Sequence, residues 1–316
     1  MNSSSPTFIW RNIFEGKSTD IDWQHSGIDV LADGRLIYAA PNGSTLVIED
    51  LASQSREFVE TAVHEMHDVV AAGNGIWLCD IGHKYVLEGD SYVDRFTPAR
   101  VVRIDTSGKI LQELVQPNLP AFSEKSWSPT GLTVAPNGDI WIADGYSSYL
   151  VLRFNAQGEF LEYFTGEKTG LAFNCPHAIK CIDGDNGYEM VIADRANKRL
   201  VWMSPDGSIR RIVNHPALTS PSGITRYGNG LMVTQLYGSL VYVGDDDLVE
   251  DVISGQDIHG APGWPNALND AGRPVKPQFA LGSVIAPHGI TSNAKGEIFF
   301  TQWFIGGHVL EGSPKK

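Results

Sequence analysis

The sequence has few features of secreted, membrane-spanning or nucleic-acid-binding proteins. Three cysteines in 316 residues are too few to stabilise the fold through disulfides. The longest apolar runs are about six residues, whereas a transmembrane helix needs ~20. Lysine and arginine number 24 against 37 acidic residues, and the net charge of -13 disfavours nucleic acid as a partner. The opening MNSSSPTFIW has neither a basic start nor an apolar signal core, so we expect a cytoplasmic protein with no membrane partner.

Long helical patterns are also scarce. Instead, 33 glycines and 17 prolines punctuate short runs of Val, Ile, Leu, Trp and Tyr. This texture is typical of an all-β protein. The hydrophobic fraction of 42% supplies a large core and excludes intrinsic disorder.

One repeat unit occurs six times along the chain. Each copy has a short first strand, a glycine-containing turn, a second apolar strand and further strands. The copies are about 52 residues apart on average, which accommodates four antiparallel strands with their turns. The first-strand patterns are SGIDV, HDVVA, TGLTV, HAIKC, SGITR and HGITS, which start at Ser26, His67, Thr130, His177, Ser222 and His288.

The repeat predicts an all-β fold, a six-bladed β-propeller that forms a single domain over residues 1–316. Four-stranded sheets bury one another when they are arranged radially around an axis. The last copy has only three strands, so the early strand Thr7–Phe14 is expected to supply the fourth and close the ring. The second copy is lengthened around residues 84–99. The polar, turn-rich residues 254–287 are predicted to be an inserted loop over the channel mouth.

Histidine opens the first strand in every second copy. His67, His177 and His288 are separated by about 110 residues, which places them at about 120° intervals in a sixfold ring. Three neutral imidazoles that converge on the axis suit Zn²⁺ with an open fourth position. In the alternative interpretation they only satisfy backbone carbonyls at the strand starts. The histidines outside this register are expected to be surface or packing residues: His25, His64, His215 and His308.

Side chains that follow the second strands face the same rim of the channel. Tyr146 and Arg195 follow the second strands of neighbouring copies. A nearby cation favours the anionic form of a phenol, so Tyr146 is a candidate base. Arg195 is a candidate for catalysis and for binding a substrate carboxylate. Further candidate substrate-binding residues on this rim are His83, Lys84, Tyr237 and Trp303, together with His259.

Part of the chain resembles a known enzyme family. The run SPTGLTVAPNGDIWIADGYSSYLVLRFNAQGEFLEYF, then CPHAIK and VIADRANKRLVWMSPDG, is similar to the catalytic core of peptidylglycine α-hydroxyglycine α-amidating lyase, a six-bladed propeller of the NHL-repeat type. The resemblance covers about 80 residues, from Ser128 to Gly207. It implies NHL-like four-stranded blades and a small-molecule substrate, a carbinolamide whose C–N bond is cleaved to give an amide and an oxo-acid such as glyoxylate.

The resemblance also assigns roles to particular residues. It implies that His67, His177 and His288 bind zinc, and that Tyr146 of the ADGY motif and Arg195 of the ADR motif act in catalysis. The chain departs from the family at two places. Ala39 and Ala40 stand where the family has an arginine that helps hold the substrate carboxylate, and Gly289 follows His288 in place of an aspartate that helps bind calcium. The sequence therefore favours zinc and gives no support for a structural calcium.

Two other functions remain open at this stage. A metal-dependent hydrolase would use zinc-bound water to cleave a lactone, ester or amide. A non-catalytic NHL propeller would bind a protein partner through its rim. The zinc-dependent lyase is the function that the histidine register and the resemblance favour together.

Overall fold

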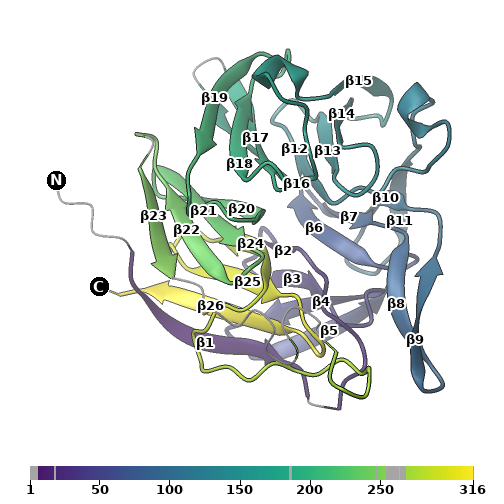
Figure 1. The fold of residues 1–316 in the computed structure, drawn as a ribbon, viewed down its shortest axis with the longest axis vertical. Coiled ribbons are helices and arrows are strands. Elements are labelled where there is room, and N and C mark those ends of the chain that lie inside the picture. Colours follow the sequence, from purple (N-terminus) through teal and green to yellow (C-terminus); the bar gives the residue numbers. More distant parts are fainter. Residues whose placement is uncertain are drawn as a thin grey trace.

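The computed structural model describes residues 6–17, 19–184, 187–246, 248–253, 263 and 268–315. Six four-stranded antiparallel sheets surround a central axis (Figure 1). This arrangement confirms the predicted all-β, six-bladed propeller, whereas the NHL type of the repeat and the single domain over residues 1–316 stay predictions. The described residues form no α-helix and two short 3-10 turns, η1 (Pro120–Phe122) and η2 (Glu167–Thr169). No helix in this described part is long and apolar enough to cross a membrane.

The blades, numbered one to six, follow the order of their innermost strands. The innermost strands are β2 (Ile28–Val30), β6 (Met66–Ala72), β12 (Gly131–Val134), β16 (Pro176–Gly184), β20 (Pro221–Tyr227) and β24 (Pro287–Ser292). The second strands are β3 (Leu36–Ala39), β7 (Gly75–Asp80), β13 (Ile140–Asp144), β17 (Gly187–Asp194), β21 (Gly230–Gln235) and β25 (Ile298–Gln302). Side chains of each second strand are buried against side chains of the neighbouring blade. These contacts form the core between the blades.

The outer half of each blade completes the sheet. The third strands are β4 (Thr45–Asp50), β10 (Arg100–Ile104), β14 (Leu150–Phe154), β18 (Arg199–Met203), β22 (Ser239–Val243) and β26 (His308–Pro314). The outermost strands are β5 (Ser55–Glu60), β11 (Ile110–Leu114), β15 (Phe160–Phe164), β19 (Ile209–Asn214), β23 (Val249–Ile253) and, in blade six, β1 (Phe8–Glu15). Strand β1 pairs with β26 from Phe8 opposite Pro314 to Glu15 opposite His308, so both ends of the chain contribute to one sheet.

The innermost strands approach one another closely around the axis. A Cβ on Gly289 would lie 2.5 Å from the Cα of Gly27, and a Cβ on Gly223 would lie 2.4 Å from the carbonyl oxygen of His288. Only glycine allows such an approach between backbones. We call the residue that opens each repeat copy its register position. Packing at the axis therefore requires the small residue that follows most of these positions.

The aspartates that end three of the second strands have a structural role. Asp144 accepts hydrogen bonds from the backbone N–H groups of Ser128 and Ser148, each at 2.6 Å. Asp80 likewise accepts from three backbone N–H groups, and Asp194 accepts from the backbone N–H of Asn174 and from the side-chain amide of Asn197, each at 2.8 Å. Each carboxylate thus holds the loop that carries the rim residues of its blade.

Two insertions extend beyond the regular blades. The lengthened second copy forms a two-stranded hairpin, β8 (His83–Glu88) and β9 (Ser91–Phe96), between the second and third strands of blade two. The second insertion is the predicted loop at 254–287. Its residues 254–262, which include His259, and 264–267 lie outside the described residues. Its place over the channel mouth therefore stays a prediction.

Candidate active site

Four histidine rings meet at one end of the propeller axis. The ring centroids of His67, His177 and His288 are 4.5 to 4.9 Å apart, and His25 lies 4.3 Å from His67 and 4.6 Å from His288. One nitrogen from each of the four rings lies within 4.8 Å of the others. The three histidines that share a register position along the chain are therefore close together in space.

A β-bulge accompanies each register histidine. The pairing of β6 with β7 shifts between Met66 and Asp68, that of β16 with β17 between Pro176 and Ala178, and that of β24 with β25 between Pro287 and Ile290. The histidine lies within each shift. Bulges re-aim a side chain relative to the regular pleat, which explains how these imidazoles turn toward the axis.

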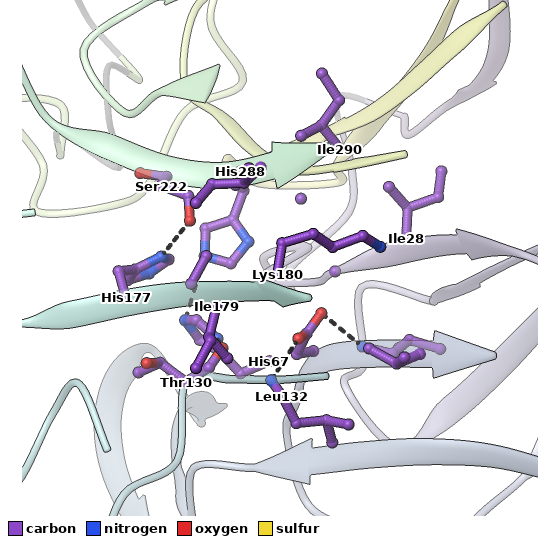
Figure 2. A pocket seen from close by; sticks show the side chains of 18 of the residues that line it. Ile28, His67, Thr130, Leu132, His177, Ile179, Lys180, Ser222, His288 and Ile290 are labelled. Carbon is purple, nitrogen blue, oxygen red and sulfur yellow. Dashed lines mark hydrogen bonds between the residues drawn. The ribbon is translucent and has the colours of Figure 1, made fainter. Parts of the chain in front are cut away.

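The neighbouring blade fixes the tautomer of each register histidine. Nδ1 of His67 lies 2.6 Å from the carbonyl oxygen of Thr130, and Nδ1 of His288 lies 3.0 Å from that of Ser26. Nδ1 of His177 lies 2.8 Å from the carbonyl oxygen of Ser222, the contact drawn between these two residues in Figure 2. A carbonyl oxygen only accepts, so each Nδ1 carries the hydrogen and each Nε2 keeps its lone pair.

The Nε2 lone pairs fit a metal ion. Nε2 of His67 and Nε2 of His288 are 3.2 Å apart, and with both hydrogens on Nδ1 no proton lies between them. Two nitrogens bound to one tetrahedral Zn²⁺ are about 3.3 Å apart. Burial holds the pKa of His67 and of His177 well below the usual range and lowers the pKa of His288 to about 3. Neutral imidazoles are the form that binds metals.

The position of His25 differs from the expectation based on the sequence. It was expected to be a surface or packing residue, yet its ring lies against two of the register histidines and stacks on Trp303 at 4.8 Å. The preceding Gln24 holds the segment in place because its amide group donates to the Ala39 carbonyl at 2.9 Å and accepts from the His308 N–H at 3.0 Å. The repeat gave no signal for His25, because the segment lies one residue before the register position and outside every strand.

Tyr146 brings a hydroxyl group into the cluster. Its Oη lies 3.2 Å from Nε2 of His67 and 3.1 Å from Nε2 of His177. The guanidinium of Arg195 lies over the Tyr146 ring, 5.3 Å from the centroid. Removal of the phenol from water raises the pKa of Tyr146, and the positive charge of Arg195 opposes that rise. Without a metal the phenol is therefore held in its protonated form.

Two cavities lie beside Tyr146, and one of them reaches the histidine cluster through His25. One has a volume of about 790 Å³ and is lined by His25, His83, Lys84 and Trp303 among others. The other has a volume of about 840 Å³, and its lining includes Arg195 and Lys125. Both are lined by Ile81, His83 and Tyr146. A substrate could therefore extend into both cavities from a reacting group at Tyr146.

The predicted substrate-binding residues differ in their placement. His83, Lys84 and Trp303 line the first cavity, whereas Tyr237 is 45% exposed and is absent from the described lining of both cavities. Lys84 is buried, and its Nζ forms an ion pair with Glu65 at 2.5 Å. Its charge is thus already compensated within the wall.

Comparison with known proteins finds relatives that are all named as the same kind of enzyme. A Caenorhabditis elegans protein described as a probable peptidyl-α-hydroxyglycine α-amidating lyase is 27% identical over 161 residues, 49% of this chain and 45% of that protein. The Drosophila melanogaster peptidyl-α-hydroxyglycine α-amidating lyase 2 is 31% identical over 108 residues, 32% of this chain and 26% of that protein. These relatives confirm the resemblance, although each match covers less than half of the relative. No family model matches the chain.

Solved structures share the fold at low sequence identity. A streptogramin B lyase superposes with a TM-score of 0.63 at 15% identity, covering 99% of this chain and 100% of that one. A Xanthomonas campestris gluconolactonase gives a TM-score of 0.61 at 12% identity, covering 99% of this chain and 96% of that one. At this identity the similarity establishes the fold alone, because one propeller architecture hosts many chemistries.

Proposed function

We propose that this protein is a zinc-dependent lyase that cleaves the C–N bond of a carbinolamide to release an amide and an oxo-acid such as glyoxylate. One observation carries the proposal: the Tyr146 hydroxyl lies within 3.2 Å of two neutral, tautomer-locked imidazoles. The lyase names of the relatives support the same chemistry.

The residues suited to hold the metal are His67, His177 and His288, through Nε2. Three nitrogen ligands leave a position open for substrate. When bound there, Zn²⁺ would supply Lewis acidity that polarises the α-hydroxyl of the substrate.

The side chains around the cluster have complementary tasks. Tyr146 Oη accepts the proton of the α-hydroxyl, and the O–H electron pair forms the carbonyl of the oxo-acid while the C–N bond breaks. The amide nitrogen that leaves takes up a proton, which Tyr146 can return. Arg195, over the face of the Tyr146 ring, favours the phenolate and lies where it can bind the substrate carboxylate.

Product analysis tests the reaction. The purified protein is incubated at neutral pH with N-benzoyl-α-hydroxyglycine in ¹⁸O-labelled water, and the products are identified by mass spectrometry. We expect benzamide and glyoxylate in equal amounts, formed faster than without enzyme, and no label in the benzamide; the aldehyde oxygen of glyoxylate exchanges with water and is not used. Labelled benzoate would instead establish the hydrolase, and turnover no faster than the blank would contradict catalysis of this substrate.

Metal analysis tests the cofactor separately. We expect about one Zn per chain, loss of metal in His177→Ala, and retention in the control His215→Ala, which removes an exposed histidine outside the cluster. Chelation should abolish turnover and added zinc should restore it. A metal-free preparation with full activity would refute zinc dependence.

A further inference from the structure

The two cavities beside Tyr146 differ in charge. The lining of the larger one includes the cationic side chains of Arg195 and Lys125. The lining of the cavity of about 790 Å³ combines the charged side chains of Glu65, Lys84 and Asp90 with a set of aromatic and aliphatic ones: Trp23, Tyr85, Tyr92, Trp303 and Leu268. The described site is therefore divided into a cationic half and an apolar half that share Tyr146.

The charged groups in the wall of the apolar half are paired. Lys84 forms an ion pair with Glu65 at 2.5 Å, and both side chains are buried. Asp90, whose side chain is almost fully exposed to solvent, pairs with Arg273 at 2.7 Å. His83 contacts Asp94 at 2.5 Å. A charged ligand group would find no free counter-charge among these residues, so the wall favours a neutral occupant.

The hairpin β8–β9 holds the apolar wall in place. Tyr92 on β9 donates a hydrogen bond from its hydroxyl to the Ile21 carbonyl at 2.8 Å. The ring of Trp23 packs edge-on against Tyr92 at 4.7 Å and lies 6.1 Å from Tyr85 on β8. Rigid aromatic side chains on an anchored hairpin form a preformed surface, which binds an apolar group at little entropic cost.

We infer that the cavity formed by Trp23, Tyr85, Tyr92 and Trp303 binds the acyl group of the substrate, and that this group is neutral and apolar, an aromatic ring above all. The inference rests on the proposed function, in which the acyl group is attached to the reacting carbon through the amide nitrogen. The carboxylate end then extends into the half that contains Arg195. The preferred substrates are aromatic N-acyl derivatives of α-hydroxyglycine.

Binding of unreactive ligands tests this inference without the reaction. N-benzoylglycine and N-acetylglycine carry the same amide and carboxylate but lack the α-hydroxyl, and their affinities for the full chain can be measured by titration calorimetry. Wild type should bind the benzoyl compound at least about tenfold more tightly, since a phenyl ring buries much more apolar surface than a methyl group. Tyr85→Ala should reduce this ratio to below about threefold, whereas Tyr85→Phe should keep it.

The control is Tyr163→Ala. Tyr163 lies on the outermost strand of blade three and is 45% exposed, against 48% for Tyr85. This variant should retain the full ratio. Equal affinities in wild type, absence of binding by both ligands, or an unchanged ratio in a folded Tyr85→Ala would overturn the inference.

The two proposals fail in different ways. Discrimination between the ligands that depends on Tyr85, without turnover of N-benzoyl-α-hydroxyglycine, would retain the apolar pocket and reject the lyase reaction. Turnover without discrimination would retain the reaction and reject the pocket.

Discussion

At the scale of single residues, the chemistry of the cluster depends on which nitrogen of each imidazole carries the hydrogen. Blades two, four and six provide His67, His177 and His288. The blade that follows each of them provides the carbonyl oxygen that contacts Nδ1. The two interpretations of the histidines from the sequence are therefore compatible, because each concerns a different nitrogen. Nδ1 satisfies a backbone carbonyl, and Nε2 is left for a ligand.

Tyr146→Phe provides a prediction at this scale. The change removes Oη, the atom that we propose moves the proton, and leaves the four imidazoles in place. We expect kcat to fall by a factor on the order of 10² to 10⁴ while the metal content stays at the wild-type level. Steady-state kinetics and elemental analysis of the same preparation measure both. Tyr163→Phe is the matched control, and a Tyr146→Phe enzyme with wild-type kcat would exclude the phenol from the mechanism.

At the scale of elements, strand β26 depends on a buried histidine. His308 is fully buried; its Nε2 lies 2.9 Å from Oδ1 of Asn12 on β1, and its Nδ1 lies 2.8 Å from Nε2 of Gln302 on β25. The first contact requires the hydrogen on Nε2, so Nδ1 accepts from the Gln302 amide. Protonation of Nδ1 would place two donors against each other, and His308 thus links three strands of blade six only while it is neutral. The sequence analysis expected a surface or packing residue here, and the structure places His308 in the packed interior.

This arrangement predicts how stability depends on pH. Burial lowers the pKa of His308 from 6.5 to about 4, so between these values the unfolded chain binds more protons than the folded one. The free energy of unfolding should therefore decrease as the pH falls from 7 to 5, with a contribution from His308 on the order of 1–2 kcal/mol. Urea denaturation at both pH values measures it. His308→Gln should show a smaller decrease than wild type or the control His215→Gln; an equal decrease in all three would contradict the assignment.

At the scale of the whole molecule, the ring is completed by strands from opposite ends of the chain. Strand β1 covers the edge of β26, and its Phe8 and Ile13 side chains are buried. Arg11 donates from Nε to Glu311 across the pair at 3.0 Å. Without β1 the sheet of blade six would expose an edge strand and part of its core.

Removal of residues 1–15 tests this closure. We expect the midpoint of thermal unfolding to fall by on the order of 10 °C, with a tendency to aggregate through the exposed edge of β26. Scanning calorimetry and light scattering measure the two effects. Ile9→Ser is the control because Ile9 is 61% exposed on the same strand and its backbone pairing is unaffected. An unchanged midpoint in the truncated protein would show that β1 contributes little to the ring.

The sequence by itself determined the propeller and the convergence of its histidines. Six copies of one strand pattern specify six similar sheets, and a residue type that recurs at one position of every second copy is repeated at about 120° intervals around the axis. Tyr146 and Arg195 were named as candidates from their places after two equivalent strands. These features follow from periodicity, which is a property of the order of residues along the chain.

Only the tertiary structure decided the rest. His25 joins the cluster because Gln24 connects its segment to blades one and six. The charge of Lys84 is compensated because Glu65 lies beside it. The apolar wall likewise forms where the hairpin β8–β9 meets Trp23. Each of these contacts involves at least one segment outside the repeat, so no periodic signal reports it. They arise from side-chain packing between non-equivalent loops, which depends on three-dimensional distance rather than on spacing in the sequence.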